Sequence, residues 1–144
     1  MRAKVHRIMS VLLILLIICV SASPSQAIEP RASDYLAVTQ AWATALGGGK
    51  VIVEFDMGTT HTMKQLGAKE IVLKEKQSDG GYDTVKTYTS SNTAGLIKTN
   101  STCAYGRVTY SGTSGKKYYA IVTFYAKDSD GSEIMYHATN TITA

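Results

Sequence analysis

Cysteine is scarce in this sequence of 144 residues, which contains Cys19 and Cys103 and no others. Cys19 lies in an N-terminal leader that we expect to be removed, which would leave Cys103 alone. A domain with one cysteine has no intramolecular disulfide, so its stability must come from packing. The roughly 117 residues after the leader can bury one core. We therefore predict one domain, and leave open its oligomeric state and whether Cys103 pairs between chains.

A strong excess of basic charge is also missing once the leader is set aside. The whole chain has 15 Lys and Arg against 11 Asp and Glu, but three of the bases, Arg2, Lys4 and Arg7, precede the apolar part of the leader. Removing these three leaves 12 bases against 11 acids, a net charge of +1, and no basic run longer than Lys116–Lys117. Nucleic-acid-binding proteins usually present clustered basic surfaces. We therefore expect no nucleic-acid partner.

A single long apolar run occurs in the chain, at Val11–Val20. It is about half the ~20 residues that a membrane-spanning helix needs. Basic residues precede it and small residues follow, with Ser25 and Ala27 suitably placed for cleavage before Ile28, which is typical of a secretory signal peptide. Ala22 is a weaker alternative cleavage position. We predict secretion without stable membrane insertion, and three parts: a signal-peptide helix at 1–27, a linker at 28–32 and a domain at 33–144.

The predicted domain consists of short runs of alternating apolar and polar residues, separated by clusters of Gly, Ser, Asp and Asn. This pattern is typical of strands and turns. The clearest run is Tyr118–Ala126, in which alternate residues form an apolar face, while Tyr119, Ile121, Thr123 and Tyr125 form the other. A second run places Val51, Val53, Phe55 and Met57 on one face. The predicted strands are 50–57, 70–75, 85–88, 104–110, 118–126 and 133–143.

The segment Tyr35–Leu46 fits two interpretations, because its apolar residues match both helical and strand spacing. We favour a seventh strand, since a lone helix would need a sheet face to cover. Seven short strands predict an all-β fold, an antiparallel two-sheet sandwich of the immunoglobulin or fibronectin type III kind. The cysteine, tryptophan and cysteine spacing of a true immunoglobulin domain is missing, because one cysteine cannot make it.

Two resemblances support this fold. The run Tyr118–Ala126 with its following polar glycine turn resembles the penultimate strand and last hairpin of fibronectin type III domains. A second resemblance covers most of the chain after the leader. It rests on the segments Ala32–Tyr35, Gly49–Phe55, Thr62–Met63, Leu66–Ala68, Tyr110–Gly112, Gly115, Tyr118–Ala120 and Phe124–Ala126. In these segments the chain is similar to a family of small secreted proteins of clostridial-type Firmicutes, which are Gram-positive. The family carries no assigned function, so this resemblance implies secretion and a sandwich and transfers no catalytic residue.

Motifs for metals and cofactors are incomplete. The acidic turn Asp128–Glu133 lacks the spacing of an EF-hand loop, and Asp and Gly are common in turns for backbone reasons alone. The run Gly47–Lys50 precedes a predicted strand, whereas a phosphate-binding loop opens a helix. His61 and His137 lack neighbouring zinc ligands at short spacing. We expect neither a metal nor a cofactor.

Catalytic signatures are missing as well. The sequence contains no Gly-x-Ser-x-Gly elbow, and the residues around Cys103 match no thiol-protease signature. We therefore predict no catalytic residue and a protein that is not an enzyme.

Tyrosine is the feature that suggests a function, because all nine tyrosines follow the leader. Tyrosine provides a large amphipathic contact area and is common on recognition surfaces, although it also fills half-buried strand faces. We predict Tyr119 and Tyr125 as binding residues of a secreted protein that binds an unknown protein or glycan partner at the cell surface or outside the cell. The alternatives are a secreted enzyme or protease inhibitor with an unrecognised active loop, and a structural component of the cell envelope.

Overall fold

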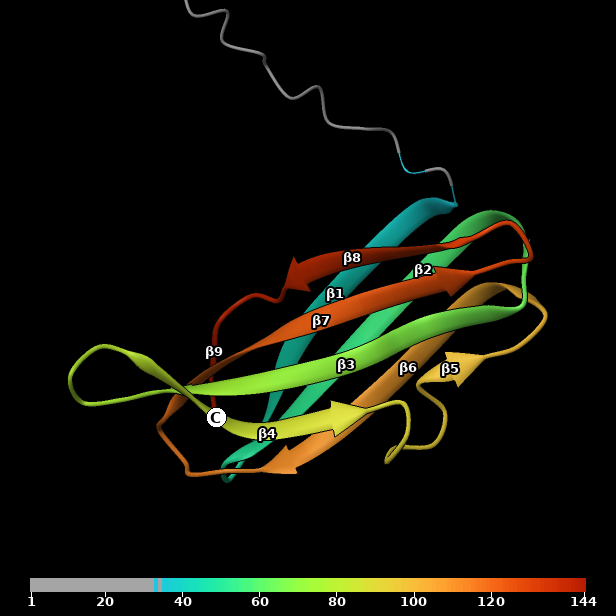
Figure 1. Cartoon of the computed structure of the whole chain (residues 1–144). Coiled ribbons are helices and arrows are strands. Elements are labelled where there is room, and N and C mark those ends of the chain that lie inside the picture. The colour runs from blue at the N-terminus through green and yellow to red at the C-terminus, as the bar shows by residue number, and fades with distance from the viewer. Residues whose placement is uncertain (1–32, 34) are drawn as a thin grey trace, which may run out of the picture. The chain divides into compact units, whose positions relative to one another are not determined.

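The computed structural model describes Ser33 and residues 35–144, which fold into nine β-strands (Figure 1). The predicted signal peptide and linker lie outside these residues. Among the described residues there is no helix with the length and apolar character to cross a membrane. The strands are β1 (Leu36–Gly47), β2 (Lys50–Met63), β3 (Gln65–Lys76), β4 (Tyr82–Thr89), β5 (Ile97–Lys98), β6 (Ser101–Ser111), β7 (Lys117–Lys127), β8 (Ser132–Ala138) and β9 (Ile142–Thr143).

All seven predicted strands are present, and most extend beyond the predicted ends. The ambiguous segment at residues 35–46 is strand β1, so the preference for a strand is confirmed. The predicted strand at 133–143 is interrupted, because residues 139–141 between β8 and β9 are irregular, although Thr139 still bonds to Ala120 of β7. The short strand β5 was not predicted.

The strands form two antiparallel sheets, which confirms the predicted all-β, two-sheet architecture. One sheet has the order β1-β2-β6, and the other has the order β4-β3-β7-β8, with β5 paired to β3 and β9 paired to β7. Figure 1 shows the sheets as two layers, with β3 and β7 in front of β1, β2 and β6. Side chains from both layers form one core, in a β-sandwich-like arrangement.

Strands β2 and β7 contribute the centre of this core through their alternate residues. Val51, Val53, Phe55 and Met57 of β2 are buried, as predicted, and so is every second residue from Tyr118 to Ala126 on β7. Phe55 meets Phe124 across the two sheets edge to face, with ring centroids 6.1 Å apart. Full burial of one such side chain contributes about 1.5–3 kcal/mol to stability.

The buried Tyr118 at the start of β7 carries a hydroxyl that needs polar partners. The hydroxyl accepts a hydrogen bond from the backbone N–H of Thr113 (2.9 Å) and donates one to Oε2 of Glu75 on β3 (2.7 Å). Desolvation raises the pKa of Tyr118 above its ordinary value. The hydroxyl therefore connects the β6–β7 turn with the neighbouring strand β3.

Side chains also form hydrogen bonds with the two outer strands of the three-stranded sheet. The amide of Asn140 accepts from the backbone N–H of Ala43 (2.9 Å) and donates to the carbonyl of the same residue (3.0 Å), which occupies one edge of β1. On β6, the carbonyl of Thr109 accepts from the hydroxyl of Tyr88 (2.8 Å). Unpaired strand edges are templates for association with another chain. These contacts shorten the part of each edge that lacks hydrogen-bond partners. The broad surfaces that remain are the outer faces of the two sheets.

Candidate functional site

The two tyrosines predicted as binding residues lie on the outer face of β7, and both are half-buried. They are six residues apart, which is about 20 Å along a strand. Tyr119 packs edge to face against Tyr82 of β4, with ring centroids 4.8 Å apart. Tyr125 lies opposite Ile134 of β8, and the ammonium group of Lys69 is 5.3 Å from its ring centroid. The two tyrosines thus belong to different local clusters.

An irregularity in β3 places two adjacent charged residues on this face. The register between β3 and β7 shifts between Ala68 and Glu70, which is a β-bulge. Ala68 and Ile71 are both buried in the core, so the two residues between them, Lys69 and Glu70, both lie on the outer side. Bulges commonly re-aim side chains in this way. A cation and a carboxylate are therefore adjacent on one face of the sheet.

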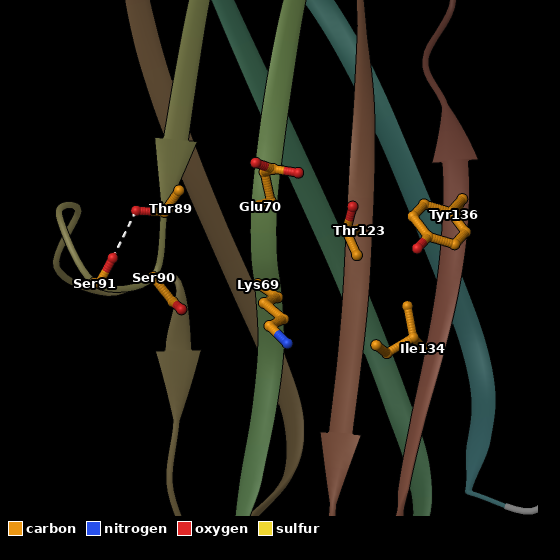
Figure 2. A pocket seen from close by; sticks show the side chains of 8 residues that line it. All are labelled: Lys69, Glu70, Thr89, Ser90, Ser91, Thr123, Ile134 and Tyr136. Atoms are coloured by element: carbon orange, nitrogen blue, oxygen red, sulfur yellow. Dashed lines mark hydrogen bonds between the residues drawn. The ribbon is translucent and has the colours of Figure 1, made fainter.

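Beside this pair the outer face is hollowed, with a volume of about 480 Å³ (Figure 2). Thr123 is only 7% exposed and lies between the larger residues of β3 and β8, where it forms the floor. Tyr136, 71% exposed, and Ile134, 45% exposed, line the side formed by β8. The end of β4 and the following turn, Thr89–Ser91, line the opposite side.

A second hollow, of about 300 Å³, adjoins the first. It is lined by Gln65, Lys69, Ser90, Ile97 and Tyr125. Lys69 and Ser90 line both hollows, so Tyr125 and the first hollow belong to one continuous surface. This surface combines exposed apolar side chains with charges of both signs and hydroxyl groups, which suits recognition of a partner molecule.

The residues that could have supported catalysis, His61, His137 and Cys103, line neither hollow. His61 Nε2 is 3.2 Å from Asp128 Oδ2, and its Nδ1 is 3.2 Å from the hydroxyl of Thr60. Neither hollow includes this chain of hydrogen bonds. The ring of His137 packs against Phe124, and Cys103 is exposed on β6.

The acidic turn between β7 and β8 is used for structural contacts. The backbone N–H of Ser129 and, to a smaller extent, His61 lower the pKa of Asp128. Glu133 accepts hydrogen bonds from the hydroxyl of Ser33 (2.8 Å) and the backbone N–H of Tyr35 (3.2 Å), and so holds the start of the domain. Across Ser33 and residues 35–144, no three His, Cys, Asp or Glu side chains gather as potential metal ligands.

Sequence reasoning missed most of the residues around the hollow. Tyr136 and Ile134 belong to a predicted strand, and their alternation indicates that they share a face. Nothing in the sequence marks Lys69 and Glu70 as outward neighbours, because regular alternation would put one of them in the core.

Comparison with known proteins does not add an assignment. No protein-family model matches this sequence, and no curated protein matches it. The function must therefore be inferred from the surface itself.

Proposed function

We propose that this protein is a secreted, non-enzymatic domain of the immunoglobulin or fibronectin type III kind that binds an extracellular protein partner. The proposed binding surface is the outer face of the β4-β3-β7-β8 sheet. One observation carries the proposal: Tyr136 and Ile134 stand exposed at a hollow that the outward pair Lys69 and Glu70 also lines.

The strand order supports the proposed fold type. If β1, β2, β3, β4, β6, β7 and β8 are lettered A, B, C, C′, E, F and G, the sheets become A-B-E and C′-C-F-G. Immunoglobulin-like domains place A, B and E in one sheet and C, F and G in the other. Tyr118 adds support, because these domains often carry a tyrosine near the start of strand F whose hydroxyl bonds to the backbone a few residues upstream, as Tyr118 does with Thr113.

The composition of the surface favours a protein partner over a glycan at this position. Tyrosine is frequent among the residues that dominate protein–protein binding, where it fills a desolvated pocket surrounded by polar contacts. Here Tyr136 has the aliphatic Ile134 beside it and charges of both signs across the hollow. A partner with an apolar centre and a mixed-charge rim would match this arrangement.

Secretion and the resemblance to clostridial-type secreted proteins are part of the same proposal. The apolar run after three basic residues supports export, and the small residues at positions 25 and 27 support cleavage before Ile28. Mass spectrometry of the protein released by Gram-positive cells that express the whole chain tests this. We expect an N-terminal peptide that begins at Ile28. A membrane-embedded species that retains Cys19 would contradict it.

The non-enzymatic part of the proposal is supported by the side-chain contacts of His61, His137 and Cys103, because among the described residues no hydrogen bond joins any two of these three side chains. The self-associating envelope component is less favoured, because Asn140 and Tyr88 occupy edge groups of the three-stranded sheet.

The binding surface can be tested by disrupting its apolar side. We would immobilise the protein from Ile28 onwards, identify partners that it retains from an envelope extract, and measure the affinity of each purified partner. Tyr136→Ser should weaken binding at least tenfold, because hot-spot residues contribute about 2 kcal/mol or more. Ile134→Ser and Lys69→Glu should weaken it by smaller factors.

The matched control is Leu46→Ser, which removes a side chain of similar exposure (57%) from the other sheet. It should leave the affinity unchanged. A partner that binds wild type, Tyr136→Ser and Leu46→Ser equally would show that the hollow is not the binding surface.

A further inference from the structure

The outer face of the opposite sheet carries an organised group of three side chains. Trp42 of β1, Glu54 of β2 and Tyr105 of β6 come from three adjacent strands. One carboxylate oxygen of Glu54 accepts a hydrogen bond from the indole N–H of Trp42 (2.9 Å), and the other accepts from the hydroxyl of Tyr105. One carboxylate thus fixes the polar edges of two aromatic rings, while Tyr105 stays 46% exposed and Trp42 partly exposed.

The register of the sheet sets the positions of the two aromatic residues. Trp42 is paired with Glu54, whereas Tyr105 is paired with Asp56, two residues further along β2. Two strand spacings across the sheet and two residues along it place the Cα atoms of Trp42 and Tyr105 about 12 Å apart. Both side chains reach from these positions to the one carboxylate of Glu54, so the two rings lie side by side and together can contact one extended chain.

The remaining side chains of the patch are hydrogen-bonding groups. Alternation places Gln40, Asp56 and Arg107 on the same outer face as Trp42. Gln40 and Asp56 occupy paired positions, and Arg107 is paired with Glu54. Amide, carboxylate and guanidinium groups all form paired hydrogen bonds with vicinal hydroxyls. Two acids beside one base leave little net charge, which does not favour a strongly charged ligand.

We infer that this patch, the Trp42–Glu54–Tyr105 platform, is a second binding site that takes an extended neutral glycan. The C–H faces of sugar rings would contact Trp42 and Tyr105, because these hydrogens are attracted to the negative face of an aromatic ring. The sugar hydroxyls would bond to Gln40, Asp56 and Arg107.

The hydrogen bonds to Glu54 hold the two rings in position before a ligand binds. Ordering a side chain on binding costs about 0.5–1.5 kcal/mol, and a ring already held by a hydrogen bond avoids part of that cost. The same hydrogen bond to Glu54 is the main reason why the pKa of Tyr105 is raised. The site does not depend on the proposed protein-binding hollow, which lies on the other sheet.

Tryptophan fluorescence tests the inference directly, because Trp42 is the one tryptophan of the chain. We would titrate the protein from Ile28 onwards with hexamers of β-1,4-linked N-acetylglucosamine, β-1,4-linked glucose and β-1,4-linked mannose. Polygalacturonate provides a charged comparison. At least one neutral hexamer should produce a saturable change in emission, confirmed by calorimetry.

Two substitutions of Tyr105 separate ring contact from ring positioning. Tyr105→Ala removes the second ring and should weaken binding at least tenfold. Tyr105→Phe keeps the ring but loses the hydrogen bond to Glu54, and should weaken binding by about two- to fivefold. The melting temperature of each variant shows whether it remains folded. The control Tyr136→Ser, on the other sheet, should bind the hexamer like wild type.

Three results would overturn the inference. The first is an unchanged Trp42 emission and no heat of binding with all three neutral hexamers. The second is equal affinity of wild type and a folded Tyr105→Ala or Tyr105→Phe variant for the hexamer. The third is a Tyr105 substitution that weakens binding of a protein partner but leaves glycan binding unchanged, which would make the platform a protein interface. A negative result of the Tyr136 experiment would not affect this inference. A negative result of the hexamer titrations would likewise not affect the proposed protein-binding surface.

Discussion

Replacement of Tyr118 by phenylalanine tests how the sandwich is held together at its β6–β7 corner. The substitution keeps the buried ring and removes one oxygen atom. That oxygen accepts from the backbone N–H of Thr113 at 2.9 Å and donates to the Glu75 carboxylate at 2.7 Å. After the substitution the Thr113 N–H and the Glu75 carboxylate each lose a hydrogen bond, at a partly buried position where water cannot fully replace it.

The expected loss follows from these two bonds. A neutral hydrogen bond contributes about 1 kcal/mol and one to a charged group about 1.5–3 kcal/mol, so Tyr118→Phe should lower the free energy of unfolding by about 2.5–4 kcal/mol. A domain of this size has a total stability of roughly 5–15 kcal/mol. The melting temperature should therefore fall by ~10 °C or more.

Urea denaturation followed by Trp42 fluorescence measures this loss, and circular dichroism gives the melting temperature. Tyr110→Phe is the matched control, because the ring of Tyr110 lies 6.0 Å from that of Tyr118 and its hydroxyl makes no hydrogen bond with the residues that the structure describes. The control should change stability by less than ~0.5 kcal/mol. If Tyr118→Phe costs no more than Tyr110→Phe, the hydroxyl does not stabilise the corner.

Alkaline pH gives an independent readout of the same group. Burial raises the pKa of Tyr118 above its ordinary value of 10.0, so the folded protein keeps this proton where the unfolded chain releases it. The resulting stabilisation is complete below pH 10 and is lost as the pH rises through the folded-state pKa. Tyr118→Phe should reduce the loss of stability above pH 10. Part of the loss should remain, because burial also raises the pKa of Tyr88.

Three other predictions concern the core, the β3–β5 contact and acid stability. Phe124→Ala should lower the free energy of unfolding by ~3–5 kcal/mol in urea denaturation, because the ring is fully buried. The control Asp130→Ala in the exposed turn should change it by less than ~0.5 kcal/mol. Equal effects would place Phe124 outside the core. Gly67→Ala should detach β5 from β3, because Gly67 has φ +152° and an added Cβ would overlap the carbonyl oxygen of Leu96. The Ala68 amide donates a hydrogen bond to that oxygen, so its hydrogen exchange should accelerate. Unchanged protection of this amide would contradict the prediction. Asp128→Asn should reduce the loss of stability at acid pH. The lowered pKa of Asp128 gives stabilisation that is present above the ordinary value of 3.8 and is lost as the pH falls through the folded-state pKa. An unchanged dependence of stability on acid pH would show that this carboxylate does not contribute.

The strands were predictable because alternation is a local property of the sequence. Every second residue of β7 is apolar, and the buried face from Tyr118 to Ala126 follows directly from this pattern. Strand β1 was ambiguous for the same reason, since its apolar residues satisfy both helical and strand spacing. Burial of Ala41 and Ala43 on either side of Trp42 resolves the ambiguity in favour of a strand.

The candidate sites were less predictable because they depend on pairing between strands that are distant in sequence. The bulge at Lys69 breaks the alternation that sequence reasoning assumes, and only the partner strand β7 reveals the extra residue. Thr123 becomes the floor of a hollow because Tyr136 lies opposite it on β8. The predicted pair Tyr119 and Tyr125 illustrates the reverse, since alternation places both on one face of β7, whereas their neighbours on β4 and β3 could not be read from the sequence.

Register also explains why the tryptophan platform has no signature in the sequence. Trp42 and Tyr105 are 63 positions apart and carry no shared motif. They become neighbours because both β1 and β6 pair with β2 in registers that bring their outer faces to Glu54. A shift of one residue in either pairing would turn Trp42 or Tyr105 to the core side, because such a slip moves every side chain of the strand to the other face of the sheet. The hydrogen bonds of Glu54 to both rings therefore depend on the registers of two strand pairs at once, and a substitution that changes either register should separate the rings without altering any residue of the platform.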